Sequence, residues 1–417
     1  MQSLADLVVD RPGDFRVHTD AYVSPAIFEL EMRRIFERTW VYVAHESQLP
    51  AAGDYITTTI GTQPVIVTRD TRGVVHVLLN RCRHRGSIVC RLASGRAAQF
   101  MCPYHNWVYA TDGALISFAQ KEGYPQDLDR ADLGLARAAV GTYGGLIFAR
   151  LDPHGESLDA RLAAVRRYID LWNERSPHGR IRVTQSAHRI AYTGNWKLQM
   201  ENGVDGYHGN YVHSSFMRIV DRAGERPVAA FTAVRDTGST RGLAAGDGMI
   251  ERPGGGMAGQ FDYRDPRLAS YHAQLAAAHG AERREEILGQ RNLLIFPNLF
   301  LFESHIRVLQ PVSAAQTIVT MYPTILEGVP DEMNVARLRA HERFFGPAGF
   351  GTPDDVEMFV NCESGLRAHA VSWVRLDRGL HREQLNDGEP SSHSTDETPQ
   401  RSAYRRWREL MRTETVV

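Results

Sequence analysis

Apolar and polar positions alternate over short runs between about residues 54 and 150, and these runs are rich in β-branched and aromatic residues. A period of two places the apolar side chains on one face of a strand, and the Gly and Asp clusters between runs are typical of tight turns. The pattern predicts a compact all-β domain. Its expected strands are Tyr55–Ile60, Pro64–Thr68, Val74–Leu79, Gln99–Tyr109 and Gly145–Ala149.

The pattern changes after the breaker run Asp152-Pro153-His154-Gly155. Apolar residues then recur at intervals of three and four, with arginines between them, which predicts a helix and a domain boundary near residue 155. The apolar positions of this helix are Leu158, Leu162, Val165, Ile169 and Trp172.

Beyond the boundary, strand and helix patterns mix. Such a mixture predicts an α+β domain with antiparallel pairing. We expect strands within Val183–Tyr192, Leu293–Val308 and Thr317–Tyr322, and helices over Glu332–Phe345 and Asp354–Ala370.

Two segments show neither period. Gly238–Gln260 is rich in glycine and is interpreted as a loop over a site or as a disordered insertion. Ser391–Gln400 is polar, and we expect a solvated linker there before a C-terminal helix that contains Trp407.

The charge balance excludes some functions. The chain has 48 Lys and Arg against 49 Asp and Glu, so no strong field would draw it to nucleic acid or to an anionic membrane. Charged residues interrupt the N-terminal segment before any signal-peptide core, and no later stretch could span a bilayer. At 417 residues, we expect two or three domains of a cytoplasmic protein.

Four cysteines are too few for a disulfide framework in a chain of this length, so free thiols or metal ligands remain. Cys82-x-His84 and Cys102-x-x-His105 both lie in the β domain and match the ligand set of a Rieske [2Fe–2S] centre, in which cysteines hold one iron and histidines the other. A structural zinc site built from the same four residues is the alternative. The remaining cysteines, Cys90 and Cys362, are interpreted as small buried hydrophobes.

A second group of possible ligands lies just inside the second domain. On a helix, Asp205 and His208 share a face, whereas His208 and His213, five residues apart, do not. Gly209 and Asn210 could relax the helix so that both imidazoles converge. Spacing alone leaves open whether these residues bind a metal or are ordinary surface and core residues.

Both motifs resemble those of a known family. The runs Asn80–Ser87 and Cys102–Trp107 resemble the cluster-binding loops of Rieske proteins, and Glu201–His213 resembles the mononuclear-iron motif of aromatic ring-hydroxylating oxygenase large (alpha) subunits. The resemblance implies a Rieske [2Fe–2S] domain over residues 41–155 and a helix-grip (START-like) catalytic domain with an antiparallel sheet over 156–417. Residues 1–40 would pack on the catalytic domain.

The resemblance also implies the ligands of both metal sites. The cluster would be held by Cys82, His84, Cys102 and His105, and the mononuclear Fe(II) by a facial triad of two histidines and one carboxylate, His208, His213 and Asp355. The stretch Thr352-Pro353-Asp354-Asp355 also reads as an ordinary helix start, with Thr352 as N-cap and acids beside the helix dipole. Asp354 is therefore the alternative third ligand.

The implied reaction is cis-dihydroxylation, or monohydroxylation, of an aromatic ring with O₂, using electrons from NAD(P)H delivered by a reductase or ferredoxin. The run Glu201–His208 looks most like the benzoate, toluate and anthranilate branch, so an aromatic carboxylic acid is the expected substrate. Arg307 is a candidate for binding its carboxylate, or else a surface residue, and Asn202 is a candidate neighbour of the iron. The alternatives are a Rieske electron carrier and a non-catalytic zinc protein.

The family further implies an assembly. Three large subunits would form a ring, with small beta subunits (α3β3) or without them (α3), and each cluster would lie beside the iron of a neighbouring subunit. Asp205 would join the two sites by accepting hydrogen bonds from His208 and from His105 of the adjacent subunit.

Overall fold

The computed structural model describes residues 4–184, 186–225, 227–252 and 261–412. These residues form two compact units. One unit is Phe36–Ala160, and the other joins the described residues up to Ile35 to those from Arg161 onward.

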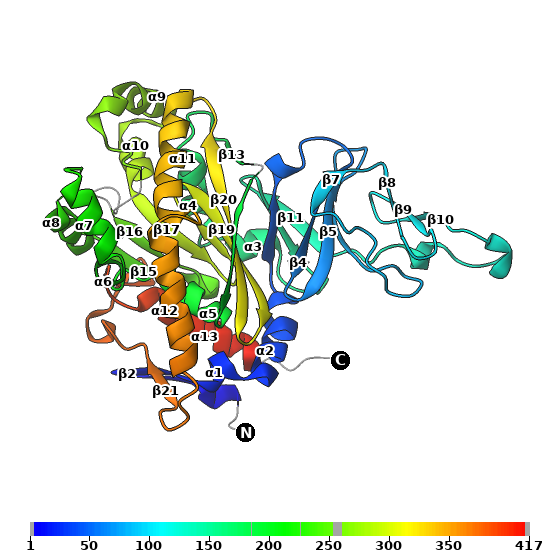
Figure 1. The fold of residues 1–417 in the computed structure, drawn as a ribbon, viewed down its shortest axis with the longest axis horizontal. Coiled ribbons are helices and arrows are strands. Elements are labelled where there is room, and N and C mark those ends of the chain that lie inside the picture. Colours follow the sequence, from blue (N-terminus) through cyan, green and yellow to red (C-terminus); the bar gives the residue numbers. More distant parts are fainter. Residues whose placement is uncertain (1–3, 185, 226, 253–260, 413–417) are drawn as a thin grey trace. The chain divides into compact units, whose positions relative to one another are not determined.

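The smaller unit consists of three antiparallel sheets with strand orders β6-β5-β4-β7, β10-β9-β8 and β11-β12-β3 (Figure 1). Its strands are β3 (Val41–His45), β4 (Asp54–Ile60), β5 (Gln63–Arg69), β6 (Val75–Leu79), β7 (Ser94–Arg96), β8 (Gln99–Met101), β9 (Val108–Ala110), β10 (Leu115–Ser117), β11 (Ala139–Tyr143) and β12 (Leu146–Arg150). The prediction of an all-β domain is confirmed. The expected strand over Gln99–Tyr109 is two strands, because the turn that begins at Cys102 separates β8 from β9.

In the larger unit, the described residues form a ten-stranded antiparallel sheet. The strand order is β13-β20-β19-β18-β17-β16-β15-β23-β22, and β14 also pairs with β20. The bounds are β13 (Ile181–Val183), β14 (His188–Thr193), β15 (Ser239–Gly242), β16 (Gly248–Arg252), β17 (Gln290–Ile295), β18 (Leu299–Leu301), β19 (His305–Ser313), β20 (Gln316–Leu326), β22 (Gln384–Asn386) and β23 (Glu389–His393).

Helices cover both faces of this sheet. Trp172 of α4 packs beside Leu293 and Leu301 on one face. The other face holds α5, α12 and the C-terminal helix α13, and α12 crosses in front of the sheet in Figure 1. The helices of this unit are α1 (Asp20–Val23), α2 (Pro25–Glu31), α4 (Arg166–Asn173), α5 (Trp196–Asn202), α6 (Gly209–Val212), α7 (Ser214–Arg222), α8 (Val228–Asp236), α9 (Ala269–His279), α10 (Ala281–Leu288), α11 (Asp331–Phe345), α12 (Gly351–Gly365) and α13 (Thr398–Arg412).

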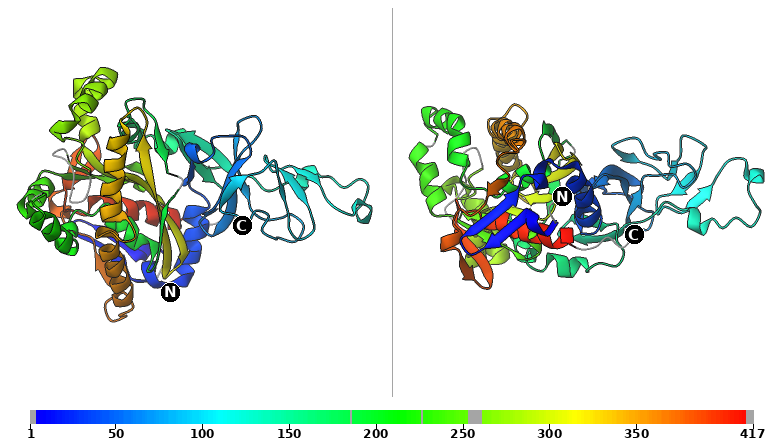
Figure 2. Two further views of the ribbon diagram at one scale, coloured as in Figure 1. Left: turned by 45° about the horizontal axis from the view of Figure 1, so that its top comes forward. Right: turned by 90° about the horizontal axis from the view of Figure 1, so that it is seen from below.

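The two ends of the chain meet in the larger unit. Strands β1 (Val8–Arg11) and β2 (Asp14–His18) form a small sheet with β21 (Trp373–Arg375). Asp10 accepts hydrogen bonds from Arg405 and Arg408 of α13. Figure 2 shows the blue N-terminal strands beside the red α13 in both views.

The helix expected from Leu158 to Trp172 is interrupted. It consists of α3 (Leu158–Leu162) and α4, which begins at Arg166. The break follows Leu162, where the backbone N–H of Val165 bonds to Leu162 O in a turn.

The glycine-rich segment was expected to be irregular, and its described part is not. Residues 239–242 form β15 and 248–252 form β16, with a short 3-10 turn between them, whereas 253–260 lie outside the described residues. Gly242 and Gly248 pack against α13, where an added Cβ would lie 3.0 Å from Ser402 Cβ and 2.7 Å from Pro399 Cβ. These glycines permit close packing between strand and helix, which is why glycine content here does not indicate a loop.

The prediction of a solvated linker over Ser391–Gln400 is also wrong. Its first part belongs to β23, its last part begins α13, and the polar side chains between them are buried. Asp396 accepts hydrogen bonds from the guanidinium of Arg382 and from the hydroxyl of Ser392. Because their polar groups bond to one another, these residues pack in the interior despite their polarity.

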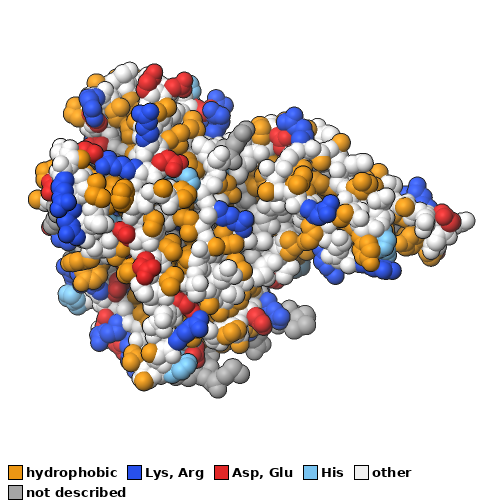
Figure 3. Space-filling model, viewed as in Figure 1, with side chains coloured by type: hydrophobic (Ala, Val, Ile, Leu, Met, Phe, Trp, Pro, Cys, Tyr) orange, Lys and Arg blue, Asp and Glu red, His pale blue; other side chains and the backbone are white. Residues whose placement is uncertain are grey.

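None of the helices in the described residues is long and apolar enough to cross a membrane. On the face drawn in Figure 3, acidic and basic side chains are interspersed. This mixture agrees with a formal net charge of −1.

Candidate metal centres

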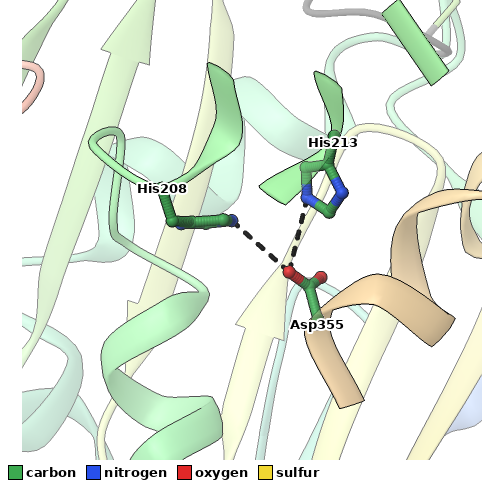
Figure 4. A group of neighbouring side chains, drawn as sticks. All are labelled: His208, His213 and Asp355. Carbon is green, nitrogen blue, oxygen red and sulfur yellow. Dashed lines mark ion pairs between the residues drawn. The ribbon is translucent and has the colours of Figure 1, made fainter. Parts of the chain in front are cut away.

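Two histidines and one aspartate of the larger unit converge on a common point. Oδ1 of Asp355 lies 3.5 Å from Nε2 of His208 and 3.3 Å from Nε2 of His213 (Figure 4). Among the residues that the structure describes, this is the one group of three or more His, Cys, Asp or Glu whose ligand atoms lie within 4.8 Å of one another. Two imidazoles and a carboxylate in this arrangement match a facial triad for ferrous iron.

Interruptions in the helical structure bring the two histidines together. Helix α5 ends at Asn202, a turn follows, and His208 precedes the single turn of α6. His213 lies between α6 and α7 with non-helical backbone angles, φ −92° and ψ 21°. The chain therefore relaxes before His208 and at His213, and not at Gly209 and Asn210 as expected.

Asp355 comes from α12, far along the chain. This helix begins at Gly351, so the prediction of Thr352 as N-cap is wrong; the Thr352 hydroxyl donates to Phe345 O instead. The side chain of Asp355 is 9% exposed and faces both histidines, whereas that of Asp354 is 34% exposed and lies 3.5 Å from the other ring nitrogen of His213.

Further polar groups hold the three residues in place. The amide nitrogen of Asn202 donates to Asp355 Oδ1 at 3.1 Å and lies 3.3 Å from His208 Nε2. Oδ2 of Asp205 lies 3.2 Å from Nδ1 of His208. Burial opposes the charge of Asp355, but hydrogen bonding from His213 and attraction to His208 hold its pKa below the usual range. This carboxyl is therefore ionised at neutral pH, as a metal ligand must be.

The Cys-x-His and Cys-x-x-His segments of the smaller unit form two matching turns. In each turn the cysteine N–H donates to the carbonyl five residues on, Cys82 to Ser87 and Cys102 to Trp107. The residue four positions after each cysteine donates back to the cysteine carbonyl and has a positive φ, 73° at Gly86 and 54° at Asn106. Glycine and asparagine adopt this backbone conformation most readily.

These turns bring the imidazoles together over a buried pair of thiols. Nδ1 of His84 lies 3.1 Å from Nδ1 of His105, and His84 stacks on Trp107 with ring centroids 5.3 Å apart. Cys82 and Cys102 are buried, and Cys82 Sγ lies 3.2 Å from the hydroxyl of Tyr109. Each turn thus contributes one histidine to the imidazole pair and one buried cysteine.

Comparison with known proteins identifies this combination. Residues 39–128 match the family described as Rieske [2Fe-2S] domain, and residues 180–413 match the family described as ring hydroxylating alpha subunit (catalytic domain). The second match covers more than half of the chain. The chain belongs to the ring-hydroxylating oxygenase alpha subunits.

Similar alpha subunits include the anthranilate 1,2-dioxygenase large subunit of Acinetobacter baylyi, which is 34% identical over 89% of this chain and 82% of that protein. The 2-halobenzoate 1,2-dioxygenase large subunit of Burkholderia cepacia is 34% identical over 91% and 83%. The structure of naphthalene 1,2-dioxygenase with bound indole aligns with a TM-score of 0.86 at 24% identity, over 99% of this chain and 95% of that chain. The expected fold, a Rieske domain followed by an α+β catalytic domain, is confirmed.

Membership in the family establishes a [2Fe–2S] cluster and a mononuclear iron as the cofactors of this oxygenase subunit. The donors present in the chain fit both groups. Atoms bound to one zinc ion at 2.0–2.3 Å must all lie within about 4.6 Å of one another. Among the described residues, the two cysteines and two histidines of the smaller unit form no such group, as expected when a cluster with two irons separates them. The match of residues 180–413 to the catalytic domain of ring hydroxylating alpha subunits supports an oxygenase over a zinc protein or an isolated electron carrier.

A cavity adjoins the triad in the oxygenase subunit. Phe302, Phe344 and Phe345 contribute apolar walls to it. Arg307 lines the cavity and is 3% exposed, so its interpretation as a surface residue is wrong.

Two further residues line the cavity, Arg252 and Asn292, and no sequence pattern indicated either of them. Arg252 belongs to the segment that was expected to be a loop. Asn292 lies next to a predicted strand, but no pattern indicated which face of a sheet it would occupy.

The two remaining cysteines were expected to be buried. Cys90 is half-buried, and Cys362 is exposed near the end of α12. That prediction is wrong for Cys362, which lines an open pocket with Tyr22 and Leu198.

Proposed function

We propose that the cluster ligands of this oxygenase are Cys82, His84, Cys102 and His105, and that His208, His213 and Asp355 hold the mononuclear iron. The observation that supports the second assignment best is the convergence of these three side chains on one point. The domain boundaries that we propose are those expected from the sequence: residues 41–155 for the cluster and 156–417, with 1–40, for the iron.

Electrons would come from NAD(P)H through a reductase or ferredoxin. When bound, the two metal groups supply one-electron transfer and dioxygen chemistry. The chain's own residues orient the ligands. Asp205 lies beside the outer nitrogen of His208, and Asn202 holds Asp355 by a hydrogen bond. Asp205 would also accept a hydrogen bond from His105 of a neighbouring subunit in an α3 ring, with or without three beta subunits.

The substrate class that we propose is an aromatic carboxylic acid. The support is twofold: relatives with 34% identity are named for anthranilate and 2-halobenzoate, and the cavity beside the triad combines phenylalanines with buried arginine. The aromatic walls would hold the ring, and Arg307 is one candidate for the carboxylate. The phenyl groups also exclude water from the reacting ring.

The decisive experiment uses the purified chain with its reductase and any beta subunit. We expect about three irons per chain, the rhombic EPR signal of a Rieske cluster, and NAD(P)H-dependent oxygen uptake that yields a hydroxylated product from benzoate or 2-aminobenzoate. Turnover of uncharged arenes in place of every aromatic acid would contradict the substrate class while leaving the oxygenase assignment intact.

A further inference from the structure

Two buried arginines line the cavity beside the triad from different strands of the sheet. Arg252 is 4% exposed and Arg307 is 3% exposed. The register places both on one face: Ile250 pairs with Asn292, and Leu294 pairs with Phe300, which pairs with Arg307. Directly paired residues, and residues two apart on one strand, share a face. Arg252, two residues after Ile250, therefore points to the same side as Arg307.

Other buried arginines of this unit have hydrogen-bonded acceptors. Arg161 donates to both oxygens of Asp247, and Arg401 donates to Glu383. Arg337 donates to the backbone carbonyls of Thr324 and Glu303. Each of these three buried guanidinium groups therefore has acceptors that offset the cost of burying its charge.

Arg252 differs from these. Its Nη1 is buried and has no hydrogen-bond partner among the described residues. Glu303 and Asp205 attract it only through space, and burial lowers its pKa to about 10. A buried cation without a hydrogen-bonded partner is costly, and an anionic ligand in the cavity would remove that cost.

Arg307 is engaged differently. Its guanidinium lies 4.3 Å from the ring centroid of Phe302 and 5.3 Å from that of Phe345, and its charge is attracted to the triad residue Asp355. Although the Nε of Arg307 is unpaired, its guanidinium contacts these two aromatic rings and lies near the carboxylate of Asp355. Arg252 lies three strands away, which is about 14 Å across the sheet.

Resting on the proposed function, we propose that Arg252 binds the carboxylate of the substrate and sets the preference for aromatic acids. Arg307 instead forms a wall of the cavity and supports Asp355. Asn292 lies beside this site with its Oδ1 buried and unpaired, while its Nδ2 donates to Gly203 O. A guanidinium forms two parallel hydrogen bonds with a carboxylate, so binding at Arg252 would fix one end of the ring and orient the other.

The test compares benzoate with its uncharged amide, benzamide, on the holoenzyme. The dissociation constants are measured by equilibrium dialysis. We expect Arg252→Gln to weaken benzoate binding by about 10- to 100-fold and to leave benzamide binding within about twofold. Arg252→Lys should keep part of the preference for benzoate over benzamide, because lysine keeps the positive charge. Arg241→Gln is the matched control. Arg241 of β15 pairs with Met249 of β16, so its side chain lies on the face of the sheet opposite to Arg252.

Three results overturn the inference. The first is that Arg252→Gln binds benzoate as tightly as the wild type does. The second is that Arg252→Gln weakens the binding of benzoate and benzamide equally, which would indicate a structural role. The third is that Arg307→Gln alone abolishes the preference for benzoate over benzamide. In all three cases, wild-type binding of benzoate leaves the proposed function standing. Failure of the wild type to bind any aromatic acid, with both metal groups present, would instead reject the proposed substrate class and this inference together.

Discussion

His208 has a carboxylate at each ring nitrogen: Asp355 lies 3.5 Å from Nε2, and Asp205 lies 3.2 Å from Nδ1. The sequence predicted the second pair from a shared helical face. That reason is wrong, because Asp205 lies in the turn after α5. The turn still brings the two side chains together, with the Asp205 carboxylate also accepting the backbone N–H of Tyr207.

We expect Asp205→Asn to retain a reducible cluster and bound iron but to slow electron transfer between the two by about 10- to 100-fold, because a carboxylate beside the outer nitrogen orients the ligand histidine and raises its basicity. Oxidation of the reduced cluster in a single turnover, with substrate and oxygen present, measures this rate. Asp221→Asn, on the exposed side of α7, is the control. A wild-type rate in Asp205→Asn would remove this residue from the mechanism.

Asp355→Ala should lose the mononuclear iron and product formation. Asp354→Ala should keep both, because Asp354 is more exposed and only approaches the outer nitrogen of His213. Iron content and product yield of the two purified variants decide between them. The reverse pattern would move the ligand by one residue.

His208→Ala and His213→Ala should each lose one iron per chain while keeping the Rieske absorption spectrum, since each removes a third of the protein ligands of the triad. Metal analysis combined with visible spectroscopy measures both quantities. His279→Ala, at the end of α9, serves as the control histidine. Normal turnover in either triad variant would contradict the assignment.

Cys82→Ser and His105→Ala should abolish the visible absorption of the cluster, because iron–sulfur binding requires thiolate on one iron and imidazole on the other. Cys90→Ser should leave the spectrum unchanged, as Cys90 lies in the same unit but outside both turns. A native spectrum in Cys82→Ser would show that this cysteine is not a ligand.

Glu31→Gln should destabilise the larger unit by about 3–5 kcal/mol, because it leaves the ammonium of Lys197 buried without its counter-ion. Glu31 is fully buried and accepts hydrogen bonds from Lys197, from Trp196 at 2.8 Å and from Trp407 at 2.7 Å. Urea unfolding measures the change, with exposed Glu29→Gln on the same helix as the control. A loss below about 1 kcal/mol would show that the pair contributes little.

Local sequence was sufficient for β4, β5, β6 and β12 of the smaller unit, but not for the turn at Cys102, which lies inside the strand expected over Gln99–Tyr109. In each turn, the cysteine, the histidine and the residue with positive φ lie within five consecutive positions. Helix α11 and these four strands were predicted because their periodicity is a property of a few consecutive residues. Strands β3, β7, β10 and β11 were not predicted. Local patterns misled where burial depended on remote partners, as at Ser391–Gln400.

The sequence by itself therefore determined the order of the domains. Through its resemblance to the family, it also predicted the ligands of the cluster and the two histidines of the triad. Only the tertiary structure decided that Asp355, not Asp354, turns toward those histidines, that Arg307 is buried, and that Arg252 lies in a strand facing the same cavity. The physical reason is that helix and strand periods specify which residues share a face. Which face becomes the interior depends on elements far along the chain, here α5, α12 and α13, that pack on that side of the sheet.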